Sequence, residues 1–325
     1  MISFKIGDQL EPDIEREYGG DNGFQDGYIF EQSQKKCTII IKFEPQVKSI
    51  EIDFQLNQNE NTITVGLMGQ KPILVGKIFS SCSRNSLNYQ NGLFTLILSK
   101  ETYQKWPLFI IAPNEKNLID PKSRFILSLY EKKSGKYDLF LNDLHQSIVQ
   151  NYKPSRQYFL TTIAPDPKYS HPNLLPIFEL FNPIEFSESA IKSYCDILHQ
   201  EKRYIDENSI LAIVSNQSYS LMLRRALLCS PLTGELNDLP TTIKLLNLLS
   251  EVEEPEGLWF LGHHYEFGIG VKKDLKKAKD LKKRAHEKDP SLKEMKENHD
   301  HHYIAGGLAA LTALSAFFLI SKMKK

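Results

Sequence analysis

The C-terminal end of the chain carries one long uncharged run, Ile304 to Ile320, which constrains where the protein can reside. As a helix these seventeen residues would span roughly 25 Å, slightly less than the ~30 Å hydrocarbon layer of a bilayer. Only Thr312 and Ser315 are polar within the run, and both can hydrogen-bond to their own helix backbone. We therefore predict a transmembrane helix over residues 304–320, within a juxtamembrane and anchor segment of residues 299–325. The alternative is an amphipathic or buried C-terminal helix.

The N-terminus, MISFKIGDQLEPDIERE, lacks the basic segment followed by an apolar one that marks a secretory signal peptide. A single apolar span at the end of a chain leaves the ribosome only after synthesis is complete. We therefore expect a tail-anchored protein whose body faces the cytosol. The short span and the basic tip SKMKK favour the outer membrane of mitochondria or mitochondrion-related organelles, with the endoplasmic reticulum second.

The composition is that of a folded globular body, with 41% hydrophobic and 25% charged residues. The formal net charge is zero, so no general attraction to nucleic acid is expected. The four cysteines stand far apart and show no CxxC spacing, which favours buried thiols over disulfides or a zinc site. No cofactor or metal is expected. The cysteines are Cys37, Cys82, Cys195 and Cys229.

Residues 28–111 show the two-residue periodicity of β-strands with one buried face. Apolar residues alternate with polar ones over residues 50–56, 63–67 and 94–98. The stretch CTIIIKF, which begins at Cys37, is apolar almost throughout and suggests a central strand covered on both faces. Several short strands separated by turn-forming residues predict an all-β sandwich over residues 24–112, preceded by an N-terminal extension of residues 1–23.

The same region resembles the CS domain of NudC-like proteins and co-chaperones. YIFEQSQKKCTIIIKFE resembles the opening of that domain, ITVGLMGQKPILVGKIF its hairpin, and GLFTLILSKETYQKW its closing strand with Lys and Trp. The resemblance implies a β-sandwich that docks proteins, with heat-shock chaperones or dynein-associated factors as partners. Phe30 stands where the family usually has Trp. The residues that carry the resemblance are Tyr28, Phe30, Gln32, Gly66, Gly69 and Trp106.

From Pro121 onward, apolar residues recur at three- and four-residue spacing, which predicts an all-helical domain over residues 113–298. Glu256 to Asp289 resembles a single Sel-one-like repeat, a helix-turn-helix relative of the tetratricopeptide unit. One such repeat cannot bury its own faces, so we expect it to stack on the preceding helices. The motif residues are Gly262, Tyr265, Gly268, Gly270, Asp274 and Ala278, with the two turn glycines expected at positive φ.

The sequence shows no set of nucleophile, base and orienting group, and no catalytic residue is predicted. The adjacent His263 and His264 do not have the three- or four-residue spacing of helical metal ligands. The resulting hypothesis is a non-enzymatic, tail-anchored co-chaperone or adaptor that holds chaperone or client complexes at the cytosolic face of an organelle. The alternative is a membrane tether or receptor, for example for a motor, without a chaperone role. A membrane-bound hydrolase is a third reading.

Overall fold

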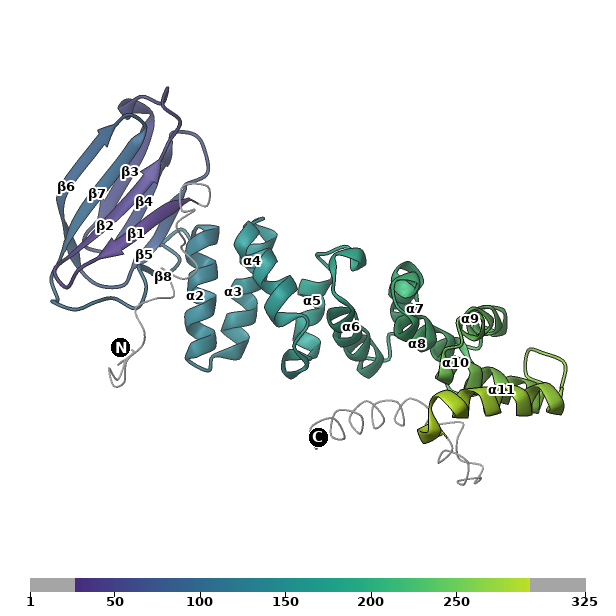
Figure 1. The fold of residues 1–325 in the computed structure, drawn as a ribbon. Helices are drawn as coiled ribbons and strands as arrows, with labels where there is room; N and C mark the ends of the chain where they lie inside the picture. Colours follow the sequence, from purple (N-terminus) through teal and green to yellow (C-terminus); the bar gives the residue numbers. More distant parts are fainter. Residues whose placement is uncertain (1–26, 293–325) are drawn as a thin grey trace. The chain divides into compact units, whose positions relative to one another are not determined.

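The computed structural model describes residues 27–292, which divide into two compact units at Thr161/Thr162 (Figure 1). The predicted anchor helix 304–320, its flanking residues 299–325 and the N-terminal extension 1–23 lie outside the described residues. Among residues 27–292, no helix is both long enough and apolar enough to cross a membrane.

The first unit contains two antiparallel four-stranded sheets. The first has the order β1-β2-β7-β6 and the second the order β3-β4-β5-β8. The bounds are β1 (Tyr28–Gln32), β2 (Lys36–Lys42), β3 (Ile52–Asn57), β4 (Thr62–Leu67), β5 (Leu74–Ile78), β6 (Cys82–Gln90), β7 (Leu93–Lys100) and β8 (Ile110–Ala112).

The two sheets pack face to face, and their inner residues form the core of the sandwich (Figure 1). Across the interface, the rings of Phe54 in β3 and Phe94 in β7 have centroids 5.8 Å apart. In the first sheet, the register pairs Ile39 with Leu96 and Ile41 with Phe94, which places these four side chains on the buried face. The period-two pattern therefore marks the correct inner residues of β7.

Two details differ from the sequence-based expectation. Ile50 was expected to point into the sandwich, but it lies in a 3₁₀ turn, Ser49–Glu51, and is 75% exposed. The chain reaches strand geometry only at Ile52, so the apparent alternation begins one turn too early. In β2, Thr38 and Ile40 are half-buried, so this strand is fully covered on one face only.

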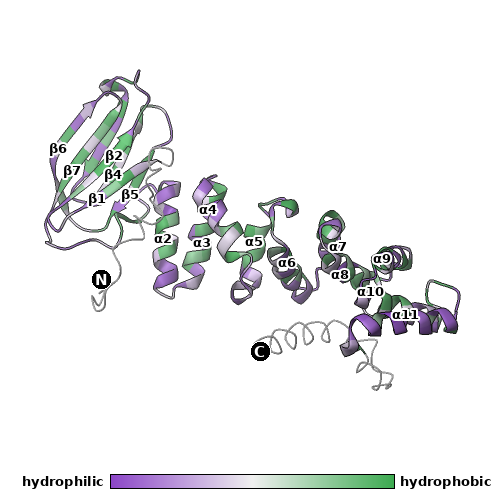
Figure 2. Cartoon of the chain, viewed as in Figure 1, coloured by the Kyte–Doolittle hydropathy of each residue, from purple (hydrophilic) through white to green (hydrophobic). Residues whose placement is uncertain are grey.

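Helices follow the sandwich, as the change of periodicity at Pro121 predicts. Unit 1 ends with α2 (Pro121–Lys133), α3 (Tyr137–Val149) and α4 (Lys153–Tyr158). Unit 2 contains α5 (Leu175–Phe178), α6 (Glu188–Gln200), α7 (Tyr204–Val214), α8 (Tyr219–Cys229), α9 (Leu239–Glu251), α10 (Pro255–Phe267) and α11 (Leu275–Lys288). Figure 2 shows α11 as mostly hydrophilic.

The first helices belong with the sandwich because the start of α2 is hydrogen-bonded to its strands. The Asp120 carboxylate caps α2 by accepting from the Ser123 amide at 2.8 Å, and it also accepts from the Val75 amide of β5 at 3.1 Å. The Tyr28 hydroxyl lies 2.8 Å from the Ser123 hydroxyl. Burial raises the pKa of Asp120 to about 6. None of these contacts leaves a local pattern in the sequence. The sequence therefore suggests a boundary at 112/113, before α2.

Candidate docking surfaces and polar clusters

The motif residues Gln32 and Trp106 form, with Lys100 of β7, one partly buried hydrogen-bonded lock at the end of the sandwich. The Gln32 amide donates to the Trp106 carbonyl at 2.8 Å, and its oxygen accepts from the Trp106 amide at 2.8 Å. The Lys100 ammonium donates to the Gln32 side-chain oxygen at 2.7 Å and to two backbone carbonyls, those of Ser33 and Gln104. All three ammonium protons thus have acceptors. Burial lowers the pKa of Lys100.

Aromatic packing completes this end of the sandwich. The Lys100 ammonium lies 4.7 Å from the centroid of the Trp106 ring. Phe109 stacks with both Trp106, at 6.4 Å, and Phe30, at 5.0 Å. Phe30, which stands where NudC-like CS domains usually have Trp, therefore still makes an aromatic contact. These contacts give Gln32, at the end of β1, and Lys100, at the end of β7, a structural role.

We expect Gln32→Leu to weaken the sandwich by about 2 kcal/mol, because two backbone groups of Trp106 and one ammonium proton lose their partner. The measurement is a urea titration followed by fluorescence in a Trp259→Phe background, in which Trp106 is the remaining tryptophan. Gln34→Leu is the control, since Gln34 is exposed. Equal unfolding midpoints for the two variants would show that the lock is dispensable.

The two glycines of the hairpin motif play different parts. A Cβ on Gly66 would lie 3.0 Å from the Pro72 Cα, so this position admits the close approach of the returning chain. Gly69 has φ +74°, which favours glycine, and open space around it. Gly66 is therefore a structural position in β4, and Gly69 is one in the β4–β5 connection.

The outer face of the β1-β2-β7-β6 sheet is unusually rich in β-branched and apolar residues for a surface. In the register, Ile29 pairs with Ile40, and Thr38 pairs with Ile97. These side chains are half-buried, and Leu93 on the same face is 38% exposed. When one face of an antiparallel sheet is solvated, the strand residues on that face are normally polar. We define the outer face as Ile29, Thr38, Ile40, Leu93, Thr95 and Ile97.

The second resemblance falls on α10, a turn and α11, which form a helix-turn-helix. Gly268 and Gly270 adopt φ of +73° and +69°, the left-handed conformation expected of them. The Asp274 carboxylate caps α11 by accepting from the Lys277 amide at 2.9 Å. The Asp274 amide in turn donates to the Tyr265 carbonyl at 3.0 Å. These four residues fix the turn.

Close approach of the two helices depends on small residues. A Cβ on Gly262 would lie 2.8 Å from the Lys282 Cγ and 3.2 Å from the Ala278 carbonyl oxygen. The pair stacks on α8 and α9, as a lone repeat requires. The shared core consists of Met222, Leu223, Ala226, Leu227, Leu245, Leu246, Leu249, Leu258, Trp259, Leu261, Leu281, Ala285 and Leu292, with Phe260 and Tyr265 packed against it.

His264 joins the turn to the end of α8. Its Nδ1 lies 2.8 Å from the Ile269 carbonyl oxygen, and its Nε2 lies 3.2 Å from the Ser230 hydroxyl oxygen. Because a carbonyl only accepts, Nδ1 carries the proton and Nε2 accepts from Ser230. This resembles a nucleophile and base pair, but both side chains are buried at 1% exposure. The pair therefore acts as a buried structural link between the α10–α11 turn and the end of α8.

His263 lies on the other side of α10, between aromatic rings. It stacks with Phe267 at 6.0 Å, contacts Trp259 edge-on at 5.1 Å, and its Nδ1 lies 3.3 Å from the Glu266 carboxylate. Burial lowers its pKa to about 4, and Lys282 adds to this shift. The two adjacent histidines thus point to different neighbours, as neighbouring helical positions must.

The lowered pKa of His263 predicts acid lability of unit 2. The unfolded chain binds this proton near pH 6.5 and the folded chain only near pH 4, so stability is full above 6.5 and falls as the pH drops through this window. We expect a loss of about 1–2 kcal/mol, allowing for the partial exposure of the ring. His263→Phe keeps the ring contacts and should remove this part of the loss. Thermal unfolding followed by circular dichroism, above pH 6.5 and near pH 4, tests this prediction. An equal loss of stability at the lower pH in the wild-type chain and in His263→Phe would contradict it.

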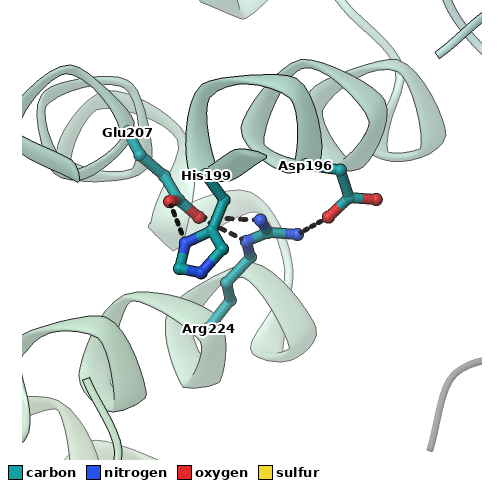
Figure 3. Close-up of polar contacts among 4 residues, drawn as sticks. All are labelled: Asp196, His199, Glu207 and Arg224. Carbon is teal, nitrogen blue, oxygen red and sulfur yellow. Dashed lines mark hydrogen bonds and ion pairs between the residues drawn. The ribbon is translucent and has the colours of Figure 1, made fainter. Parts of the chain in front are cut away.

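Glu207 of α7 is a fully buried charged residue of unit 2, with 0% exposure. Its carboxylate accepts from the Arg224 guanidinium of α8 at 2.7 and 2.8 Å and lies 3.0 Å from the His199 Nδ1 of α6 (Figure 3). Arg224 also pairs with Asp196 at 2.5 Å. The network links three helices, and every charge in it has a partner. Sequence reasoning missed it.

The cysteines do not form a reactive group. All four are buried free thiols, and burial raises the pKa of Cys82 to about 11 and of Cys195 to about 12. A thiol with a raised pKa is a poor nucleophile at neutral pH. Within residues 27–292, no group of three or more His, Cys, Asp or Glu side chains could hold a metal ion.

Comparisons with known proteins give two similar solved structures. No model of a known protein family matches the sequence, and no curated protein matches it. The chain is similar to the nuclear movement protein from E. cuniculi GB-M1, at 14% identity over 26% of this chain and 99% of that one, with a TM-score of 0.23. It is also similar to the CS domain of the human KIAA1068 protein, at 17% identity over 35% of this chain and 93% of that one, with a TM-score of 0.25. The description of residues 28–112 as a sandwich rests on its own strand order and contacts.

Proposed function

We propose that the protein is a non-enzymatic adaptor of the co-chaperone kind, which docks proteins through the outer face and is held at the cytosolic side of an organelle membrane by residues 304–320. The outer face is the observation that carries the proposal. Its isoleucines lie half-buried on the outward side of β1, β2 and β7, where a solvated sandwich would place polar residues.

The polar clusters of the described chain support an adaptor over an enzyme. Gln32 and Lys100 hold the backbone around Trp106, Glu207 holds three helices together, and His264 holds the α10–α11 turn. Each uses its hydrogen-bonding capacity inside the fold. Such a molecule would act on its partners through its exposed surfaces and not through a group of catalytic side chains.

The resemblance of residues 28–106 to CS domains supplies the class of partner. We propose chaperones of the heat-shock ninety or seventy class, with dynein-associated factors as the second class. The runner-up is a membrane tether or receptor for a motor without a chaperone role. Membrane attachment is proposed from the uncharged run, with the mitochondrial or mitochondrion-related outer membrane favoured over the endoplasmic reticulum.

Proximity labelling from the full chain, fused to a biotin ligase at its N-terminus, tests the proposal. We expect heat-shock chaperones to be enriched, and the double variant Ile40→Lys with Ile97→Lys to lose them at least tenfold, because a tenfold loss needs only ~1.4 kcal/mol. The matched control is Ile50→Lys with Met68→Lys, which changes two apolar residues that are 75% and 65% exposed.

The possible results separate the readings. Enrichment of motor subunits in place of chaperones favours the tether. Unchanged recovery with the outer-face variant, at unchanged melting temperature, means that the outer face is not the docking surface.

A further inference from the structure

Helix α11 and the turn before it form a strongly basic segment in a chain of zero net charge. Residues 272–288 contain nine Lys or Arg and three Asp or Glu, a net charge of +6. Figure 2 shows this helix as the hydrophilic end of unit 2. Its buried side is narrow and consists of Ala278, Leu281 and Ala285. The remaining circumference is open to solvent or carries charges.

Some of these charges are used within the fold. Lys282 pairs with Glu266, and Arg284 and Lys288 pair with Glu253. Lys277 donates to the Tyr265 hydroxyl at 2.7 Å. These contacts hold α11 to α10 and to the end of α9, so they are structural.

Four lysines are left over. Lys272, Lys273, Lys276 and Lys279 are exposed, and within the described part of the chain none of them forms an ion pair. Lys276, Lys279 and Lys283 recur at three- and four-residue spacing and therefore share one side of the helix, opposite Ala278, Leu281 and Ala285. The same side also carries two acids, which are paired within the helix: Glu287 lies 3.6 Å from Lys283, and Asp280 lies 3.6 Å from Arg284. We call Lys272, Lys273, Lys276, Lys279 and Lys283 the basic face.

Exposed apolar side chains flank the same turn. Phe267 at the end of α10 is 51% exposed, and Leu275 at the start of α11 is 61% exposed. Basic residues together with exposed Phe and Leu are the combination found on surfaces that rest at the headgroup level of membranes. Solubility alone would explain the lysines of this surface but not the exposed side chains of Phe267 and Leu275 beside them.

The position of the basic face in the chain adds a second reason. Ile304, the first residue of the uncharged run, follows Lys288 by sixteen residues. Even fully extended, such a connection reaches at most about 55 Å. If the run enters a bilayer, the basic face stays close to its surface at a high effective concentration.

We propose that the basic face binds the anionic phospholipid headgroups of the membrane that residues 304–320 enter, and so fixes unit 2 against the bilayer surface. The proposal rests on the membrane attachment in the proposed function. The attraction is electrostatic, so it weakens as salt screens charges beyond the Debye length. Nucleic acid and acidic proteins are the competing ligands of the same charge chemistry.

Lysine acetylation read by mass spectrometry tests the proposal on the full chain. The chain is mixed with vesicles of phosphatidylcholine alone or with added phosphatidylserine, at low and high salt. We expect acetylation of Lys272, Lys276 and Lys279 to slow about fivefold or more on the anionic vesicles at low salt only. Lys36, Lys48 and Lys71, exposed lysines of the sandwich, should react equally on both vesicles.

Substitution gives the second measurement. Lys272→Ser, Lys276→Ser and Lys279→Ser together should lower the preference for anionic over neutral vesicles in flotation by about a hundredfold. The same three substitutions at Lys36, Lys48 and Lys71 should lower it far less. If the wild-type chain does not float with neutral vesicles, the membrane span is refuted. The acetylation pattern still reports whether the basic face binds anionic headgroups. Equal acetylation on both vesicle types, or protection by added RNA or acidic peptide but not by anionic vesicles, overturns the basic-face proposal.

Discussion

Leu96→Asp is expected to unfold the sandwich. Leu96 of β7 has 0% exposure and pairs with Ile39 of β2 and Leu87 of β6. An unpaired carboxylate in this apolar layer costs several kcal/mol, which is comparable to the ~5–15 kcal/mol that stabilises a typical domain. Circular dichroism and the fluorescence of Trp106 in a Trp259→Phe background should both report loss of the β unit at room temperature.

The control for this prediction is the preceding residue. Thr95 lies on the opposite face of the same strand and is half-buried, so Thr95→Asp should cost about 1 kcal/mol or less. If Leu96→Asp leaves the sandwich as stable as Thr95→Asp does, the inner and outer faces have been assigned the wrong way round. That result would also remove the outer face as a docking surface.

Arg224→Met is expected to destabilise unit 2 by about 3–5 kcal/mol. The substitution leaves the Glu207 carboxylate, at 0% exposure, without its guanidinium partner, and a buried charge without a partner is strongly destabilising. Arg225→Met is the matched control on the same helix, because Arg225 contacts the neutral Asn208 and should cost about 1 kcal/mol or less. Urea titrations followed by helical circular dichroism measure both.

A double variant separates a charge effect from lost packing. Glu207→Leu with Arg224→Met removes both charges, so it should recover a large part of the stability that Arg224→Met loses. A double variant that is less stable than Arg224→Met alone would mean that the network matters through packing and not through charge pairing.

The strands could be predicted where one face is buried in regular alternation. Residues 94–98 show this pattern, and β7 has the predicted inward residues. Ile50 shows its limit, since alternation alone cannot tell that a 3₁₀ turn precedes β3. The contacts of Asp120 with Val75 likewise leave no local pattern in the sequence. The sequence therefore suggests a boundary at 112/113, whereas α2 to α4 belong to unit 1.

The Glu207 network carried a signal that could have been used. Glu207, Ile210, Leu211 and Val214 are spaced as one helical stripe, so the carboxylate stands at a core position of α7. A charge at such a position requires a partner, but the sequence cannot say which arginine supplies it. The Gln32 lock is similar, since its residues are 68 and 74 positions apart from their partners.

Docking of a chaperone on the outer face can be measured by a binding titration. The purified full chain is titrated with a purified heat-shock ninety chaperone, and separately with a heat-shock seventy chaperone, and the affinity is compared with that of the Ile40→Lys, Ile97→Lys variant. We expect saturable binding to at least one chaperone. The outer-face variant should weaken this binding tenfold or more, and the Ile50→Lys, Met68→Lys control should leave it unchanged. Absence of binding to both chaperones, or equal affinity for the wild-type chain and the outer-face variant, would contradict this prediction.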